Sequence, residues 1–185
     1  MGALAVARLC ESLGTPFALG GVAWERFAID PRPGPRPIEE IRGGERLDGA
    51  AVLADAATTT DDGVAFAEAG VADFLGTQTA LIDITRGVTG ASRGIAAAMK
   101  RLHCDLLLGV DVGGDVLGRG DEAGLASPLC DAVMVSAMER CARRISWGEA
   151  GSKSRTDVAW HRRGVAAKTA RTADRITVQR LEIRI

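Results

Sequence analysis

Short apolar runs alternate with longer helix-forming segments along most of the chain. The apolar runs are bounded by Gly, Pro, Thr or Asp, as buried strands often are, and they occupy residues 17–22, 50–54, 79–82 and 105–110. Segments rich in Ala and Leu favour helices over residues 2–13, 63–75, 91–102 and 128–144. This alternating order predicts an α/β fold with a mostly parallel sheet and right-handed crossovers.

Two segments interrupt this order. Residues 31–37 contain four prolines, which lack a backbone N–H donor and therefore exclude both a helix and a central strand. After residue 147 the alternation fades, and residues 151–185 carry nine Lys and Arg against three acidic residues. We expect residues 148–185 to form a basic C-terminal tail that is peripheral or disordered.

The composition narrows the classes of function. Hydrophobic residues make up 46% of the chain, aromatic residues only 4%, and the formal net charge is −1. A charge so close to zero does not favour nucleic acid or a membrane surface, and no apolar run reaches the roughly 20 residues of a membrane span. We therefore expect a cytoplasmic protein whose partner is a small molecule, with self-association to a homo-oligomer left open.

Cysteine and histidine offer little chemistry. The four cysteines form no C-x-x-C pair and lie in apolar or helical contexts, so we expect free thiols that are buried or half-buried: Cys10, Cys104, Cys130 and Cys141. Two histidines leave almost no material for a His-rich metal site or a histidine-based catalytic triad.

Aspartates end three of the predicted strands. Asp55, Asp83 and Asp111 each follow directly on an apolar run. In a parallel sheet the carboxyl ends of the strands lie at one edge, where ligands bind, so these carboxylates would converge there. With Asp61 from a following loop, they would accept hydrogen bonds from ligand hydroxyl groups or help to bind Mg²⁺. The alternative for each aspartate is a turn or a helix cap.

Residues 109–124 form the most glycine-dense segment, and we expect the ligand to bind here. Glycines let backbone N–H groups approach an anion, and the helix predicted to start at Pro128 adds its positive N-terminus. The predicted ligand-binding residues are Asp111, Gly113, Gly114, Asp115, Gly120, Asp121 and Ser127. If Mg²⁺ is bound, Asp111 and Asp115 are its expected ligands. The alternative is a tight strand-to-helix connection that needs positive φ angles.

Two glycine motifs suggest competing nucleotide functions. Residues 89–96 look like the nucleotide loop of short-chain dehydrogenases, although Ala96 replaces the last glycine and four residues separate the motif from the strand. Those enzymes use a catalytic tyrosine, and this chain has none, so NAD(P) binding without their catalysis stays open. Residues 109–115 look like the first phosphate loop of sugar kinases with the actin-like fold, but Asp115 stands where that loop usually has Thr or Ser.

Several long segments resemble one family. Residues 2–41, 58–76 and above all 104–134 (CDLLLGVDVGGDVLGRGDEAGLASPLCDAVM) resemble the family of domain of unknown function 1152, DUF1152, over about residues 2–140. The resemblance implies a Rossmann-like three-layer sandwich with a mostly parallel sheet, in a prokaryotic protein without an established activity. We therefore expect residues 1–147 to form one Rossmann-like domain.

The chain departs from this family at both ends. Members generally begin with a strand and a glycine-rich loop before the segment that starts here at Gly2, so we expect the domain to be incomplete. From Trp147 onward the sequence no longer resembles the family. A tail rich in arginine, alanine and glycine is what a frameshift in a GC-rich reading frame would produce, and we state this as a hypothesis.

The sequence as a whole predicts binding of a small phosphorylated or hydroxyl-rich metabolite at the carboxyl ends of the strands. It assigns no reaction, so an enzyme that uses Mg²⁺ and a non-enzymatic ligand sensor are both compatible with it. An NAD(P)-binding domain related to the short-chain dehydrogenases, without their catalytic tyrosine, is the third alternative.

Overall fold

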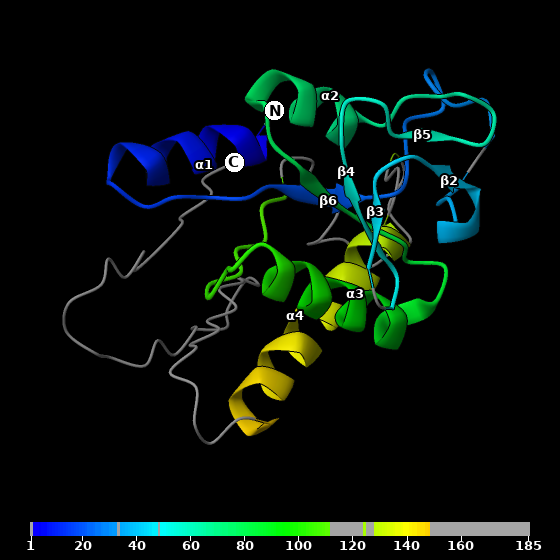
Figure 1. Ribbon diagram of the computed structural model, residues 1–185. Coiled ribbons are helices and arrows are strands. Elements are labelled where there is room, and N and C mark those ends of the chain that lie inside the picture. Colours follow the sequence, from blue (N-terminus) through cyan, green and yellow to red (C-terminus); the bar gives the residue numbers. More distant parts are fainter. Residues whose placement is uncertain (1, 33, 48, 112–123, 125–127, 149–185) are drawn as a thin grey trace.

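The chain folds as a mixed α/β protein in which a four-stranded sheet has helices on both sides (Figure 1). The computed structural model describes residues 2–32, 34–47, 49–111, 124 and 128–148. The order of strands across the sheet is β1 (Gly20–Val22), β6 (Thr79–Ile82), β4 (Ala51–Ala54) and β3 (Glu45–Arg46). A separate two-stranded sheet joins β2 (Ile41–Arg42) to β5 (Thr59–Thr60).

The predicted α/β class is confirmed, but the predicted mostly parallel sheet is not. Within the described residues, β1 and β6 are the one parallel pair, whereas β4 is antiparallel to both β6 and β3. The last residue of β4, Ala54, pairs with the first residue of β6, Thr79. The connection between these strands therefore returns the chain to the end of the sheet that it left. The alternation of strands and helices in the sequence does not indicate whether a connection crosses to the opposite end of the sheet, as in a parallel pair, or returns at the same end, as in an antiparallel pair.

Helices lie on both sides of the sheet. α1 (Gly2–Ser12) and α2 (Ala67–Leu75) are on one side, and α3 (Gly87–Arg101) and α4 (Pro128–Gly148) are on the other (Figure 1). A short 3-10 helix, η1 (Ile38–Glu40), precedes β2. All four predicted helices are present, and α3 begins four residues earlier than the sequence indicated.

Side chains that alternate along the strands divide the core between the two faces. Val52 of β4 and Leu81 of β6 belong to a cluster with Ala69 of α2. Their neighbours Ala51 and Ile82 pack on the opposite face with Ile95 of α3. Because both faces are covered, every residue of β4 and β6 is buried. The described residues thus form three layers: α2, the sheet and α3.

α4 packs against α3 and extends the second core cluster. Ala137 and Cys141 of α4 are fully buried in this cluster. The cysteine prediction is confirmed, because the four cysteines are free, with Cys130 and Cys141 buried and the other two half-buried.

The strand predicted at residues 105–110 is wrong, because the structure has no strand there. Leu107 instead packs against the cluster shared by α3 and α4. Gly109 lies so close to Met138 of α4 that a Cβ atom on the glycine would be 2.8 Å from the Met138 Cε atom. Leu107 and Gly109 thus contact the helices, although none of residues 105–110 is buried and Leu106 is exposed. A short apolar run is compatible with contact to a helix as well as with a strand, so composition alone does not distinguish the two.

Residues 89–96, which resemble a nucleotide loop in sequence, lie inside α3. Gly90 and Gly94 are both buried there. A Cβ atom on Gly94 would be 2.7 Å from the carbonyl oxygen of Ala50, so this glycine permits close packing of helix and sheet. The segment therefore does not have the loop conformation that the resemblance to dehydrogenases implies.

The remaining sequence predictions concern segments at the surface or near the chain ends. The described residues of the proline-rich segment 31–37 form neither helix nor strand, as predicted. In the part of the chain that the structure describes, none of the helices combines the length and apolar character needed to cross a membrane. The predicted tail at residues 148–185 lies outside the described residues except for Gly148, the last residue of α4.

Replacement of Gly94 by alanine tests the close approach of α3 to the sheet. Alanine favours a helix by about 1 kcal/mol over glycine, but its Cβ atom would be 2.7 Å from the Ala50 oxygen. We expect Gly94→Ala to lower the free energy of unfolding by about 1–3 kcal/mol, as overpacking does. Gly70→Ala in α2 is the matched control, because nothing lies within 4 Å of the added atom. It should raise stability by about 0.5–1 kcal/mol, and equal effects in urea denaturation would contradict tight packing at Gly94.

Candidate functional site

The proline-rich segment lies against the carboxyl end of the parallel pair β1 and β6. The N–H of Arg36 donates to the carbonyl oxygen of Ala23, just after β1, over 2.6 Å. The N–H of Ile38 donates to the Asp83 carboxylate, just after β6, over 2.9 Å. The chain itself therefore covers the edge at which open parallel sheets commonly bind ligands.

A buried ion pair holds this segment together. The Nε and Nη2 atoms of Arg36 donate to the two carboxylate oxygens of Asp30 over 2.7 and 2.5 Å. Only 3% of the Arg36 side chain and 1% of the Asp30 side chain are exposed. The hydrogen bonds from Arg36 hold the pKa of the Asp30 carboxyl below its usual range, and the same bonds raise the pKa of Arg36. Both groups therefore stay charged in the folded protein.

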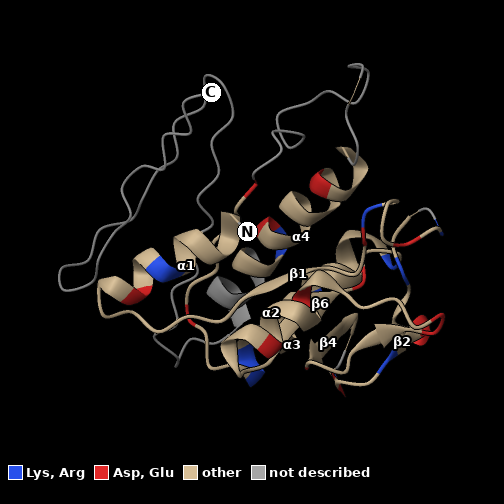
Figure 2. Ribbon diagram, turned by 90° about the horizontal axis from the view of Figure 1, so that it is seen from above, with Lys and Arg blue, Asp and Glu red and all other residues tan. Residues whose placement is uncertain are grey.

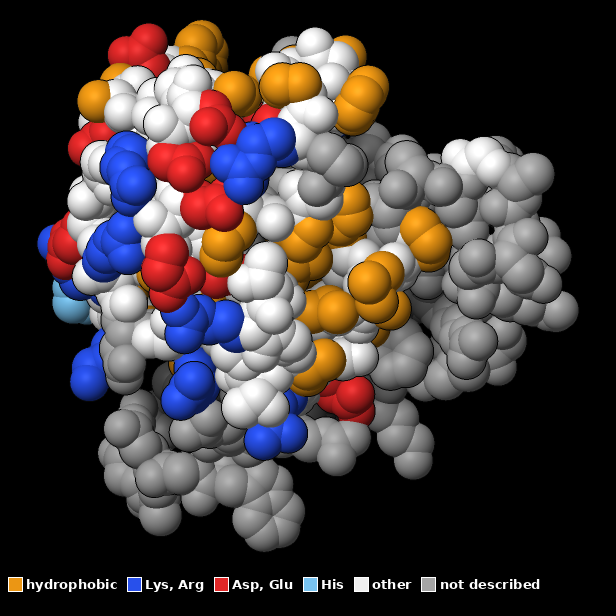
Figure 3. Space-filling model, turned by 90° about the vertical axis from the view of Figure 1, so that its right-hand side faces the viewer, with side chains coloured by type: hydrophobic (Ala, Val, Ile, Leu, Met, Phe, Trp, Pro, Cys, Tyr) orange, Lys and Arg blue, Asp and Glu red, His pale blue; other side chains and the backbone are white. Residues whose placement is uncertain are grey.

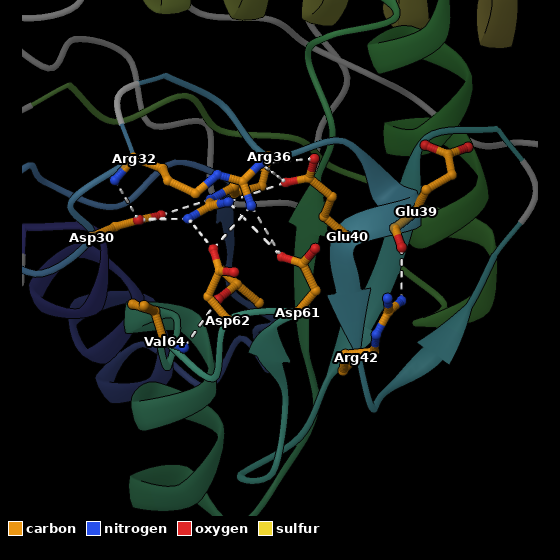
Figure 4. A network of polar contacts seen from close by, with 10 residues as sticks. Asp30, Arg32, Arg36, Glu39, Glu40, Arg42, Asp61, Asp62 and Val64 are labelled. Atoms are coloured by element: carbon orange, nitrogen blue, oxygen red, sulfur yellow. Dashed lines mark hydrogen bonds and ion pairs between the residues drawn. The ribbon is translucent and has the colours of Figure 1, made fainter.

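More exposed charges surround this pair (Figure 4). Arg36 also lies 3.1 Å from Glu40. Arg32 contacts Glu40 and Asp62 over 2.9 Å each, and Asp61 over 3.3 Å. Both arginines are thus engaged by carboxylates of the same chain. The network ties the proline-rich segment to the turn after β5, and this is the role that the structure gives to Asp61.

The structure separates the aspartates that were expected to converge. Asp83 follows β6 and Asp55 follows β4, so the antiparallel pairing of these strands puts the two residues at opposite ends of the sheet. Asp83 is fully buried and accepts hydrogen bonds from Ile38 and from the N–H and hydroxyl of Thr85. Asp55 closes a turn by accepting a hydrogen bond from the Thr58 hydroxyl. Both aspartates thus make the turn contacts that were their alternative prediction.

Most of the predicted ligand-binding loop falls outside the described residues. Asp111 is described, half-buried at the end of the segment that follows α3. The other predicted members lie outside, so ligand binding by this loop stays a prediction: Gly113, Gly114, Asp115, Gly120, Asp121 and Ser127. Within the described ranges, no group of three or more His, Cys, Asp or Glu side chains is placed to hold a metal ion.

A hollow of about 600 Å³ lies along α3, beside the turn between β3 and β4, and we call it the α3 groove. Its lining consists of Leu47, Arg93, Ala96, Ala97, Lys100, Arg101 and His103. The helical members are spaced three, four, seven and eight residues from Arg93, which puts them on one face of α3. The groove therefore combines an apolar part, made of one leucine and two alanines, with several basic side chains.

Two glycines bring the turn at residues 47–50 against α3. Gly49 has a φ of +89°, and a Cβ atom on it would be 3.0 Å from both the Arg93 Cβ atom and the Gly94 nitrogen. The N–H of Leu47 donates to the carbonyl oxygen of Ala51 over 2.9 Å, which closes the turn. These contacts hold Leu47 beside the helix, where it forms part of the groove.

The cations of the α3 groove differ in their pairing. Arg101 forms a bidentate ion pair with Glu45 of β3 over 3.0 and 2.8 Å. Arg93 and Lys100 are exposed, and neither has a carboxylate within 4.0 Å among the described residues. Figure 3 shows basic side chains gathered beside a histidine at one side of the molecule. The described lining of the groove thus has an excess of positive charge, although the whole chain has a net charge of −1.

A separate titratable feature lies where α2 meets β1. The Glu25 carboxylate accepts a hydrogen bond of 2.5 Å from the N–H of Ala67 at the start of α2. The Glu68 carboxylate lies directly over Gly21, since a Cβ atom on that glycine would be 1.8 Å from it. Burial, helped by the charge of Glu25, raises the pKa of Glu68 to about 7. The raised pKa of Glu68 makes stability depend on pH.

The sequence interpretation missed the α3 groove. Arg93, Lys100 and Arg101 share one face of a helix that was predicted correctly, and His103 follows that helix directly. The spacing of these basic residues in the sequence therefore already indicated a basic face on this helix. Leu47 comes from a distant part of the chain, and no local pattern indicates that it meets this helix.

Removal of the Asp30 carboxylate tests the buried ion pair. Asp30→Ala leaves Arg36 buried without its bidentate partner, so we expect a loss of about 3–5 kcal/mol in the free energy of unfolding at neutral pH. Because the folded-state pKa of Asp30 is lowered, its contribution is present above the ordinary aspartate range and is lost as the pH falls through the lowered value. Arg32→Ala, the exposed control in the same network, should lower stability much less. A urea midpoint close to that of the wild type for Asp30→Ala would contradict this role.

Glu68→Gln should make stability less dependent on pH. A raised pKa means that the contribution of Glu68 is fully present below its ordinary value of 4.5 and is lost as the pH rises through about 7. We therefore expect Glu68→Gln to melt at a higher temperature than the wild type above pH 7, with a difference that shrinks toward pH 4.5. Circular dichroism melts check this, with Asp73→Asn on the exposed face of α2 as control. A difference independent of pH would rule out titration of Glu68 as the cause.

Comparison with known proteins assigns a family and adds no function. No curated protein and no solved structure matches the chain. A family model described as protein of unknown function (DUF1152) matches residues 1–154, a range that includes every described residue. This match confirms the resemblance seen in the sequence, and it extends beyond Trp147, where the resemblance was expected to end. The chain belongs to the DUF1152 family.

Proposed function

We propose that this protein binds a small phosphorylated metabolite and that the α3 groove holds its phosphate group. One observation carries the proposal. Arg93 and Lys100 line the groove together with His103, and neither cation has a carboxylate partner in the described part of the chain. Cations that are not already paired attract an anion without the loss of an existing ion pair, and the helix fixes the backbone positions from which both side chains extend.

The chemistry of these side chains suits a phosphate ester. The arginine guanidinium offers planar N–H donors that match phosphate oxygens, and the lysine ammonium adds a compact positive charge. Seven residues along a helix correspond to about 10 Å. Long side chains that start at this separation reach one phosphate group placed between them.

The apolar part of the groove limits the rest of the ligand. Leu47, Ala96 and Ala97 offer hydrocarbon surface, which favours an apolar or flat portion of a ligand over a hydroxyl-rich one. Of the two ligand classes expected from the sequence, this lining therefore supports the phosphorylated one.

The groove supports binding and points to no particular reaction. Its described lining contains no serine, cysteine or carboxylate that would act as a nucleophile beside a base. A ligand sensor is therefore the simpler form of the proposal, and any catalysis would have to come from the predicted loop at residues 109–124. The free thiols of the four cysteines fit the cytoplasm, the location that we propose.

Thermal unfolding of the full chain with phosphate-bearing probes tests this proposal. We expect inorganic phosphate and phenyl phosphate to raise the melting temperature, the latter more because its ring contacts the apolar part of the groove. A ligand at about 100 times its Kd stabilises by about 2.7 kcal/mol, a readily visible shift. Phenol, glucose 6-phosphate and NADH, each with and without Mg²⁺, report on the apolar, hydroxyl-rich and dinucleotide alternatives.

A pair of double variants identifies the site. Arg93→Gln combined with Lys100→Gln should remove most of the shift caused by phenyl phosphate, because the two groove cations without a carboxylate partner among the described residues are lost. Arg26→Gln combined with Arg140→Gln removes the same charge from exposed positions outside the groove and is the matched control. The proposal fails if no phosphorylated probe shifts the wild type, or if the two double variants lose the shift equally.

A further inference from the structure

Three helices of this protein end in the same hydrogen-bonded turn. In each, a backbone N–H just beyond the helix donates to the carbonyl oxygen five residues earlier, which is the Schellman arrangement. The three bonds run from Thr15 to Cys10, from Thr77 to Ala72 and from Cys104 to Met99, at the ends of α1, α2 and α3. This turn requires a left-handed backbone at the residue before the donor.

The residue at that left-handed position differs among the three helices. It is Gly14 after α1 and Gly76 after α2, with φ angles of 79° and 65°. After α3 it is His103, with a φ of 55°, and no other non-glycine residue in the described structure has a positive φ. A left-handed backbone is strained for a residue with a Cβ atom, because the Cβ atom lies too close to the following carbonyl oxygen. Glycine at this position would therefore form the same turn with less strain.

The imidazole ring of His103 takes no part in the turn. The bonds of the turn use backbone atoms alone, from His103 to Lys100 over 3.3 Å and from Cys104 to Met99 over 2.8 Å. The ring itself is exposed and lines the α3 groove with Arg93 and Lys100. An imidazole N–H donates a hydrogen bond that a phosphate oxygen accepts, and a protonated imidazole also carries a positive charge.

We infer that His103 contacts the ligand of the α3 groove and donates a hydrogen bond to a phosphate group held by Arg93 and Lys100. The inference rests on the proposed function, and it narrows the ligand class to phosphate monoesters, whose terminal oxygens three donors can share. Strain retained at a residue that faces a groove is typical of functional positions. The competing explanation is that a protonated histidine stabilises the negative C-terminal end of α3.

His103→Gly separates these two explanations, because they predict opposite changes in stability. We expect the variant to melt about 2–4 °C higher than the wild type, since the strain is relieved. We also expect it to bind phenyl phosphate about tenfold more weakly, since a hydrogen bond to a charged group is lost. Calorimetric melts and titrations of the full chain measure both. His103→Asn, which tolerates a left-handed backbone and keeps a donor, should retain part of the affinity.

Gly76→His is the reciprocal control. It introduces histidine at the same position of the turn after α2, where nothing lies within 4 Å of a Cβ atom. It should lower the melting temperature by about as much as His103→Gly raises it, and it should leave phenyl phosphate binding unchanged.

Two results would overturn the inference while leaving the proposed function in place. One is undiminished phenyl phosphate affinity in His103→Gly, and the other is a lower melting temperature of that variant, which would assign histidine a stabilising role at the helix end. A wild type that does not bind phenyl phosphate would instead overturn the proposed function, and this inference with it. The wild-type titration therefore separates failure of the groove from failure of the histidine.

Discussion

The close approach of α3 to β4 determines much of the remaining structure. Gly94 allows the helix backbone to lie against Ala50, and Gly49 allows the preceding turn to lie against the helix. With α3 at this distance, Ile95 and Met99 are buried between the helix and its neighbours while Arg93 and Lys100 stay exposed. The same contact therefore forms the core and brings a turn and a basic helix face together as a groove.

The carboxyl end of the parallel strands is closed by the chain itself. The buried Asp30–Arg36 pair and the Asp83 carboxylate fix the proline-rich segment at the place where α/β proteins commonly bind ligands. The carboxylates found there are engaged in turns and ion pairs. The α3 groove differs from this edge, because Arg93 and Lys100 have no carboxylate partner among the described residues and lie beside an apolar lining.

Local patterns predicted the elements better than their arrangement. β4 and β6 were predictable because a strand buried on both faces consists of consecutive apolar residues. The helices were predictable because their segments consist mainly of helix-forming residues. The direction of β4 relative to β6 depends on where the segment that connects them ends, which no local pattern shows. β2 and β3 have two residues each and are too short to show a pattern of alternating apolar residues. The glycines of residues 89–96 suggested a nucleotide-binding loop but lie within a helix. Glycine is favoured both in loops and where two backbones pack closely, so its presence does not distinguish the two.

The candidate site was less predictable than the fold. Asp55 and Asp83 directly follow β4 and β6, as predicted. Their predicted convergence required these strands to be parallel, and they are antiparallel. The α3 groove forms because Leu47 and Arg93, which are far apart in the sequence, are close together in the fold. No local sequence pattern predicts that proximity. The left-handed backbone of His103 likewise follows from the turn after α3, and the residue type alone does not indicate it.

The most direct test maps amide chemical-shift changes while phenyl phosphate is titrated into the full nitrogen-15-labelled chain. We expect saturable changes that are largest at Arg93, Ala97, Lys100 and His103, because these residues line the α3 groove. Changes that are largest within residues 109–124, or no saturable change anywhere, would contradict the placement of a phosphorylated ligand in this groove.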